Sequence, residues 1–274
     1  DRFSQAIAQA AVADPDTARA AINATLEPVV TRILTDCDAT VPQGAVADWL
    51  HAEWTDAGSQ EKDLSPMDML RTGIALAEGS RAPTTGYVVG QVWRKAQDAL
   101  RAGYNPLETP AETAEVLVGF DEGLKRYSYG PPLSASHELM ALIDAGIVDL
   151  DLAVDPDFTL TDSGWTLETG GNTARASVMI DAVLPSPDLS AIAAAPVCTL
   201  VENGVLAPLG HGLAARTVPD GQVLDEQGRV VPRLCLLGRL ALGSVIAVDS
   251  LHDCFGKSSD RWAKGVCARQ TADS

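Results

Sequence analysis

The hydrophobic pattern changes period near the middle of this chain, and that change limits the possible folds. Up to about residue 145, apolar residues recur every three or four positions, as on the buried face of an amphipathic helix. Asp14 before Pro15 and Ser65 before Pro66 are typical helix starts, because a capping side chain is followed by proline in the first turn. Glycines stand where several helices are expected to end, at Gly58, Gly79, Gly103 and Gly146. The predicted helices cover residues 3–13, 15–37, 43–57, 66–78, 86–103, 111–127 and 135–145.

The second half of the chain has the pattern of strands. Short apolar runs at 147–154, 158–162, 165–169 and 174–184 are separated by turn sequences rich in Asp, Gly, Pro and Asn. We expect the first three to form an antiparallel meander. The fourth is apolar at nearly every central position, which is typical of a strand covered on both faces in a parallel sheet.

These patterns predict an α and β protein with two regions. We expect residues 1–130 to form an all-helical region and residues 131–274 to form a β-rich region with a mixed sheet and flanking helices. A length of 274 residues is compatible with about two domains.

Composition and charge exclude several classes of protein. The net charge of −17 disfavours binding to nucleic acid or to an anionic membrane surface, since both require local positive potential. No apolar run reaches the roughly 18 to 20 residues that span a bilayer. The five cysteines show no C-x-x-C spacing, which indicates neither a zinc site nor a disulfide framework and favours the cytoplasm.

The segment from residue 223 to residue 262 carries most of the functional signal. Asp225–Gly228 is a polar turn, Leu234–Leu237 is a short buried strand, and Gly238 and Gly243 bracket the loop that leads to a closing helix. The segment resembles the C-terminal end of bacterial FAD/NAD(P)-binding proteins, an FAD-dependent oxidoreductase-like family, and the order of elements matches this family from about residue 91 to residue 268. The residues of this motif are Leu237, Gly238, Arg239, Gly243, Asp249, Ser250, Leu251, Asp260, Arg261, Trp262 and Ala263.

The resemblance implies a partial Rossmann-like domain with FAD as its cofactor, and it implies that the helical region 1–130 is a cap or lid. It places Gly238, Arg239, Gly243, Ser244 and Asp249 at the flavin edge, where a strand end offers backbone N–H groups and glycine allows close approach of a ring or phosphate. The alternative is a turn that needs glycine for its backbone angles, with an aspartate that caps the next element. Neither interpretation assigns a substrate or a general base.

Such proteins hold the FAD pyrophosphate with a G-x-G-x-x-G turn in an N-terminal strand-to-helix unit, and no such unit precedes the helical region here. Residues 210–215 formally fit G-x-G-x-x-A, but Arg216–Gly221 leave no room for the required helix, so we predict a connecting loop. We therefore expect the C-terminal portion of a longer oxidoreductase, in which the complete protein, rather than this chain alone, binds FAD. The absent strand would leave an unpaired sheet edge, which predicts self-association or a partner that supplies the missing strands.

Other candidate groups have structural explanations. His252, Asp253 and Cys254 could serve nucleophilic or metal chemistry, but consecutive side chains point in different directions, and a helix-entry loop with a buried cysteine is the alternative. His137 is expected in the first turn of a helix capped by Ser134 or Ser136. Tryptophans are expected to pack in the core, and no carboxylate stands in an apolar setting that would raise its pKa.

A second class of function also fits the sequence. The chain could be a non-catalytic protein-interaction module that keeps a flavoprotein-like sheet as a scaffold. A flavin site should have an exposed apolar cleft beside Arg239 and Gly243, whereas an interaction module should bury that strand end and expose a helical patch.

Overall fold

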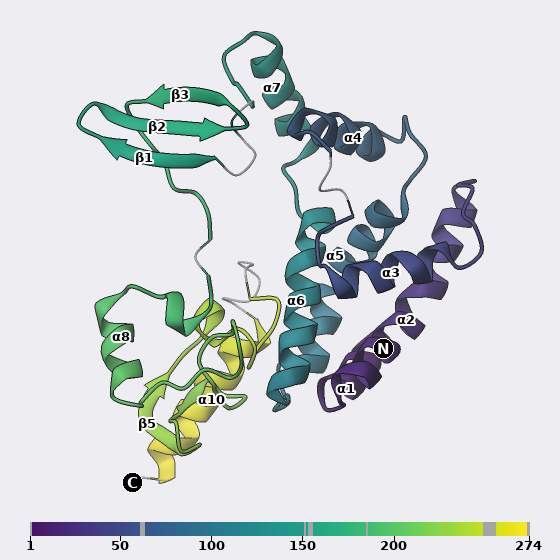
Figure 1. Cartoon of the computed structure of the whole chain (residues 1–274). Coiled ribbons are helices and arrows are strands. Elements are labelled where there is room, and N and C mark those ends of the chain that lie inside the picture. Colours follow the sequence, from purple (N-terminus) through teal and green to yellow (C-terminus); the bar gives the residue numbers. More distant parts are fainter. Residues whose placement is uncertain are drawn as a thin grey trace.

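The computed structural model describes residues 2–60, 64–150, 152, 156–184, 186–248 and 256–272. The protein is a mixed α/β structure in which the helices come first along the chain (Figure 1). The N-terminal helices are α1 (Arg2–Ala11), α2 (Pro15–Asp36), α3 (Ala45–Thr55), α4 (Pro66–Glu78), α5 (Thr85–Tyr104), α6 (Ala111–Ser128) and α7 (Leu133–Asp144). Each corresponds to one of the predicted helices, with ends that agree within about two residues.

Most of the predicted helix boundaries are confirmed. The Asp14 side chain accepts hydrogen bonds from the backbone N–H groups of residues 16 and 17, and the Ser65 hydroxyl accepts one from the N–H of residue 68. Gly79 ends α4 with a φ of 73°. One detail was wrong. Helix α7 begins before Ser134 and Ser136, with Pro132 at its N-cap.

The helical core is built around α5 and α6, with α1 and α2 packed against them. Trp93 of α5 meets Phe120 of α6 edge to face at a centroid distance of 5.3 Å, and Trp54 of α3 stacks on the same phenylalanine. Gly103 explains the close approach of α1. A Cβ atom there would lie 2.5 Å from the main-chain oxygen of Ser4, so the close contact with α1 requires glycine at this position in the last turn of α5.

The strands form two small antiparallel sheets. One contains β1 (Asp157–Thr161), β2 (Gly164–Thr169) and β3 (Asn172–Ala176), and the other pairs β4 (Gln222–Leu224) with β5 (Val230–Cys235). The predicted meander exists, but it uses 172–176 as its third strand, and residues 147–150 of the predicted first strand are not in a sheet. Every strand pair among the described residues is antiparallel, so the expected mixed sheet is not seen there.

The C-terminal part of the chain returns to the helical core. It contains η1 (Leu189–Ala191), α8 (Ala195–Glu202), η2 (Gly238–Ala241) and α10 (Lys257–Ala272). The apolar residues at 241, 242 and 245–248 belong to the same hydrophobic core as α1, α2, α5 and α6. Among the described residues, no helix is both long enough and apolar enough to cross a membrane.

Candidate functional site

The loop from Gly238 to Val248, which we call the crossing loop, follows β5 and precedes α10 in the chain. Its first half lies beside residues 207–217. The N–H of Ala214 donates to the carbonyl of Leu242 at 3.0 Å, and the N–H of Ala215 donates to the carbonyl of Leu240 at 3.1 Å. The segment 210–215 is therefore a connecting loop, as the sequence predicted, and it supports the crossing loop.

The end of α5 fixes the second half of the crossing loop. The buried Tyr104 hydroxyl donates to the carbonyl of Gly243 at 2.6 Å, and burial raises the pKa of Tyr104, so the hydroxyl remains a donor. Asn105 accepts from the N–H of Ile246 at 2.8 Å and donates to the carbonyl of the same residue at 3.3 Å. Arg101 Nε donates to the carbonyl of Ala247 at 2.9 Å. Side chains from the helical region thus hold the loop backbone in one conformation.

The N–H groups around Gly243 are already used within the protein. The N–H of Gly243 donates to the carbonyl of Val245, and the N–H groups of Ser244 and Val245 both donate to the carbonyl of Ala241. Gly243 has a φ of 111°, and a Cβ atom there would lie 2.9 Å from the Leu213 side chain. This part of the crossing loop is a closed turn that needs glycine, and its N–H groups are not directed at a ligand.

The beginning of the loop is more open. Gly238 has a φ of 68°, and a Cβ atom there would have no heavy atom within 4 Å. Arg239 Nη2 lies 3.6 Å from Glu122 Oε2 on α6. Of the residues predicted at the flavin edge, Gly238 therefore faces open space, Arg239 is turned toward α6, and Gly243 and Ser244 are packed inside. Asp249 lies outside the described residues, as do His252, Asp253 and Cys254.

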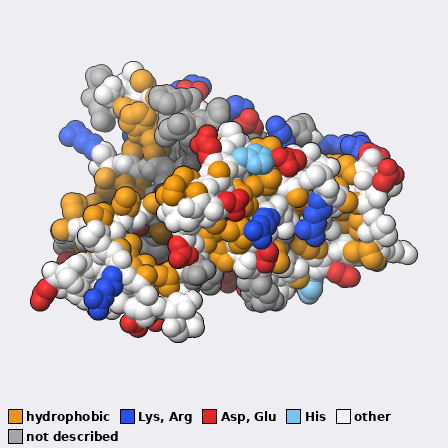
Figure 2. All heavy atoms as spheres, turned by 90° about the horizontal axis from the view of Figure 1, so that it is seen from above, with side chains coloured by type: hydrophobic (Ala, Val, Ile, Leu, Met, Phe, Trp, Pro, Cys, Tyr) orange, Lys and Arg blue, Asp and Glu red, His pale blue; other side chains and the backbone are white. Residues whose placement is uncertain are grey.

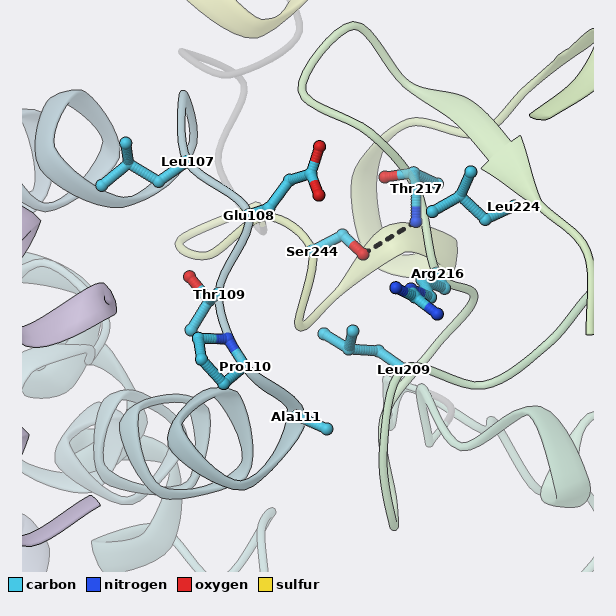
Figure 3. A pocket seen from close by; sticks show the side chains of 10 residues that line it. All are labelled: Leu107, Glu108, Thr109, Pro110, Ala111, Leu209, Arg216, Thr217, Leu224 and Ser244. Atoms are coloured by element: carbon cyan, nitrogen blue, oxygen red, sulfur yellow. Dashed lines mark hydrogen bonds between the residues drawn. The ribbon is translucent and has the colours of Figure 1, made fainter. Parts of the chain in front are cut away.

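A cavity of about 230 Å³ lies beside Ser244 (Figure 3). The Ser244 hydroxyl accepts a hydrogen bond from the N–H of Thr217 at 2.9 Å. Thr217 is 7% exposed, and its own hydroxyl has no hydrogen-bond partner among the described residues; in Figure 3 it points toward the carboxylate of Glu108. Arg216, Glu108 and Thr109 also line the cavity, which therefore offers a cation, an anion and three hydroxyl groups to a small polar ligand.

Two buried carboxylates correct the expectation that no acid stands in an apolar setting. Asp121 of α6 is 2% exposed, and burial raises its pKa, although it accepts hydrogen bonds from Trp93 Nε1 at 2.7 Å and from Gln97 Nε2 at 3.3 Å. Glu53 of α3 is fully buried, and burial raises its pKa as well.

A signal for both acids was present in the sequence. Asp121 lies four residues after Leu117 and three before Leu124, and both leucines are buried. Glu53 continues the buried stripe of Val46 and Leu50. An acid on the apolar stripe of a helix indicates a buried carboxylate. Neither Asp121 nor Glu53 lines the cavity beside Ser244.

Other candidate residues have structural positions. His137 lies on α7 with its Nε2 atom 2.8 Å from Glu78 Oε1 on α4. Arg261 of α10 donates from Nε to the carbonyl of Pro219 at 3.1 Å, which ties the closing helix to the segment before β4. In the described part of the chain, no group of three or more His, Cys, Asp or Glu side chains is placed to hold a metal ion.

Comparison with known proteins gives one partial similarity. No protein-family model matches the chain. Over 119 residues, it is 31% identical to nitrosuccinic acid synthase npaA of Aspergillus oryzae, and the match covers 40% of this chain. The chain spans only about a fifth of the length of that relative, since the match covers 18% of it.

Proposed function

We propose that this chain is the C-terminal part of an FAD-dependent, FAD/NAD(P)-binding oxidoreductase of the cytoplasm, in a partial Rossmann-like domain. The observation that carries the proposal is the open glycine at the start of the crossing loop. Gly238 follows the end of β5, adopts a left-handed conformation and borders open space, as needed where a flat ring approaches a backbone. The sequence motif around it supports the same role.

The hydrogen bonds from α5 fit this proposal. A cofactor-binding loop must keep its shape when the ligand is absent, because an ordered loop loses less entropy on binding. Tyr104, Asn105 and Arg101 provide such order through four hydrogen bonds to the loop backbone. In this proposal, FAD carries the redox chemistry, and the chain binds and orients it together with the dinucleotide-binding unit supplied from elsewhere.

The partial similarity to a synthase supports an enzymatic role. The matched protein is named for making nitrosuccinic acid, and the match is confined to 119 residues. The match favours a catalytic rather than a purely structural protein, and no substrate is assigned.

A second candidate, the non-catalytic interaction module, is favoured by one observation. Residues 241–248 are all buried, and the N–H groups around Gly243 are paired internally. In such a module the crossing loop would be a structural connection, and binding of a protein partner would be the function.

A variant pair tests the flavin role of Gly238. The protein used is the chain joined to the polypeptide encoded upstream of it, titrated with FAD. Gly238→Ala should weaken FAD binding at least tenfold, because the methyl group would occupy the space into which the ring fits. Gly79→Ala is the matched control, since Gly79 has a φ of 73°, also borders open space, and ends α4 away from the loop. Equal FAD affinities for the two variants would contradict the proposed site.

A further inference from the structure

Another cavity, which we call the α4–α7 cavity, lies among the helices of the first half of the chain. Its volume is about 490 Å³, within the roughly 300–1,000 Å³ of pockets that hold small ligands. Its walls come from α4, α5, the end of α6, the linker 129–132 and the start of α7. Figure 1 shows α4 and α7 side by side beyond the end of α6. None of the described residues that line it belongs to the crossing loop or to the cavity beside Ser244.

The charged side chains that line the α4–α7 cavity are all basic. They are Arg94 of α5 and Arg126 of α6, and its described lining residues include no Asp or Glu. The chain as a whole has 37 acidic and 20 basic residues, so a lining without acids departs from the rest of the molecule. Figure 2 looks down on the end of the molecule that carries α4 and α7, and acidic side chains are spread over that face. The charge of the cavity favours an anionic ligand.

One face of α5 supplies polar groups to the cavity. Tyr87, Gln91 and Arg94 follow each other at intervals of four and three residues, which places them on the same side of the helix, and all three line the cavity. In the part of the chain that the structure describes, neither the Tyr87 hydroxyl, the Gln91 amide nor the Arg94 guanidinium takes part in a hydrogen bond or ion pair. These groups are therefore free to bind a ligand, and a guanidinium can hold a carboxylate through two parallel hydrogen bonds.

The wall that α4 and α7 supply is apolar. It contains Met69, Leu70 and Ile74 of α4 and Leu133 of α7, and Leu133 is 37% exposed. Gly73 lies in the same wall, and a Cβ atom there would have no heavy atom within 4 Å, so the space beside α4 is open. An apolar wall combined with a few polar groups is typical of sites for small organic ligands.

The wall at Tyr127 is held in place by its neighbours. A Cβ atom at Gly90 would overlap the main-chain oxygen of Tyr127, so the close contact of α5 with this residue requires glycine. The Tyr127 ring meets Trp49 edge to face at a centroid distance of 5.1 Å, and its hydroxyl donates to Glu53 at 3.2 Å. Two consecutive prolines, at 131 and 132, restrict the linker that follows. A wall that is already ordered loses little entropy when a ligand binds.

We propose that the α4–α7 cavity binds a small organic carboxylate with an apolar body. The carboxylate pairs with Arg94 and accepts hydrogen bonds from Tyr87 and Gln91, while the apolar body lies against α4. A wholly apolar ligand would leave these polar groups without partners, and an inorganic anion would leave the α4 wall exposed to water. The inference goes beyond the proposed function and does not depend on it, because the cavity shares no lining residue with the crossing loop.

Calorimetric titration of this chain with 2-naphthoate tests the charge preference, and 2-naphthamide serves as the uncharged comparison ligand with the same rings. The amide should bind about tenfold more weakly than the acid, because it cannot form the charge-assisted hydrogen bonds to Arg94. Arg94→Gln should weaken naphthoate binding by about the same factor. Lys95→Gln is the matched control, since Lys95 is exposed, does not line the cavity and carries the same charge; it should leave the affinity unchanged.

A second pair of variants tests the apolar wall. Gly73→Leu would place a side chain in the open space beside α4 and should weaken naphthoate binding as much as Arg94→Gln does. Gly119→Leu is the control, because Gly119 also lies inside a helix with open space around a Cβ atom but does not line the cavity. Both variants should keep the circular dichroism spectrum of the parent chain, since neither new Cβ atom meets another group.

The outcomes decide the assignment without reference to FAD, because these titrations contain no flavin. Saturable naphthoate binding that Arg94→Gln and Gly73→Leu weaken, and that their controls preserve, would support the carboxylate site. Absence of naphthoate binding, or equal affinities for the acid and the amide, would overturn it. Equal losses of affinity in a variant and its control would overturn it as well.

Discussion

Asn105→Asp should destabilise the protein in a strongly pH-dependent way. Asn105 is fully buried at the end of α5, where its Oδ1 atom accepts from the N–H of Ile246 and its Nδ2 atom donates to the carbonyl of the same residue. Aspartate has the same shape, so no cavity is created. A protonated carboxyl can still donate to the carbonyl of Ile246, but an ionised one cannot, and its charge would be buried.

The magnitude follows from proton linkage. Burial will raise the pKa of the new carboxyl above its unfolded value of about 3.9, so the folded state binds more protons than the unfolded state at intermediate pH. Stability should therefore fall as pH rises between these two pKa values, by about 1.4 kcal/mol for each pH unit. Between about pH 5 and about pH 7, the variant should lose about 3 kcal/mol relative to the parent chain if its native pKa lies above that window.

Urea unfolding at the two pH values measures this loss. Asn203→Asp is the control, because Asn203 is exposed and its Nδ2 atom donates to the carbonyl of Thr199 at 2.7 Å at the end of α8. The control should stay within about 0.5 kcal/mol of the parent chain at both values. If the two variants have the same pH profile, Asn105 does not hold the crossing loop in a buried setting, and the reasoning fails.

Three further changes test the packing. Gly103→Ala should destabilise the protein by about 1–3 kcal/mol, because its methyl group meets the backbone of α1. Gly119→Ala on α6 has open space around the new methyl group and should stabilise the protein by up to about 1 kcal/mol. Calorimetry compares the two variants, and equal shifts in their melting temperatures would contradict the close contact at Gly103. Because burial raises the pKa of Asp121, the stability of the parent chain should fall as pH rises from about 3.9 toward the native pKa. Asp121→Asn should flatten this dependence of the free energy of unfolding on pH, measured by urea titration. An unchanged slope would contradict the raised pKa of Asp121. Tyr104→Phe should lower the free energy of unfolding by about 1–3 kcal/mol, because it leaves the buried carbonyl of Gly243 unpaired. The control Tyr87→Phe, on the same helix, should change the free energy of unfolding by less than about 0.5 kcal/mol. A similar loss for both variants would show that the hydroxyl of Tyr104 is unimportant.

The helices could be predicted from sequence because their signals are local. Apolar spacing and the caps at Asp14 and Ser65 involve residues within one or two turns of each other. The sequence placed Gly103 at a helix end, but it could not show that glycine is needed there for the contact with α1, which lies about a hundred residues earlier in the chain. The third strand of the meander was also misplaced, because a strand needs a partner, and residues 177–184 have the composition of a strand without one.

The candidate site was only partly visible in the sequence. The glycine spacing correctly marked a loop after a short strand, and the left-handed angles of Gly238 and Gly243 agree with it. The sequence could not show that Tyr104 binds the carbonyl of Gly243 across 139 positions, nor that the N–H groups around Gly243 are already paired. It did hold the clue to Asp121, which lies on the apolar stripe of α6.

The most direct test of the proposed function is an FAD titration followed by flavin absorbance and fluorescence. It would use this chain alone and the same chain after addition of the polypeptide encoded upstream of it. Our account predicts no binding to the chain alone, and one bound FAD with a changed flavin spectrum after the addition. No binding in either sample would contradict the flavin role and favour the interaction module.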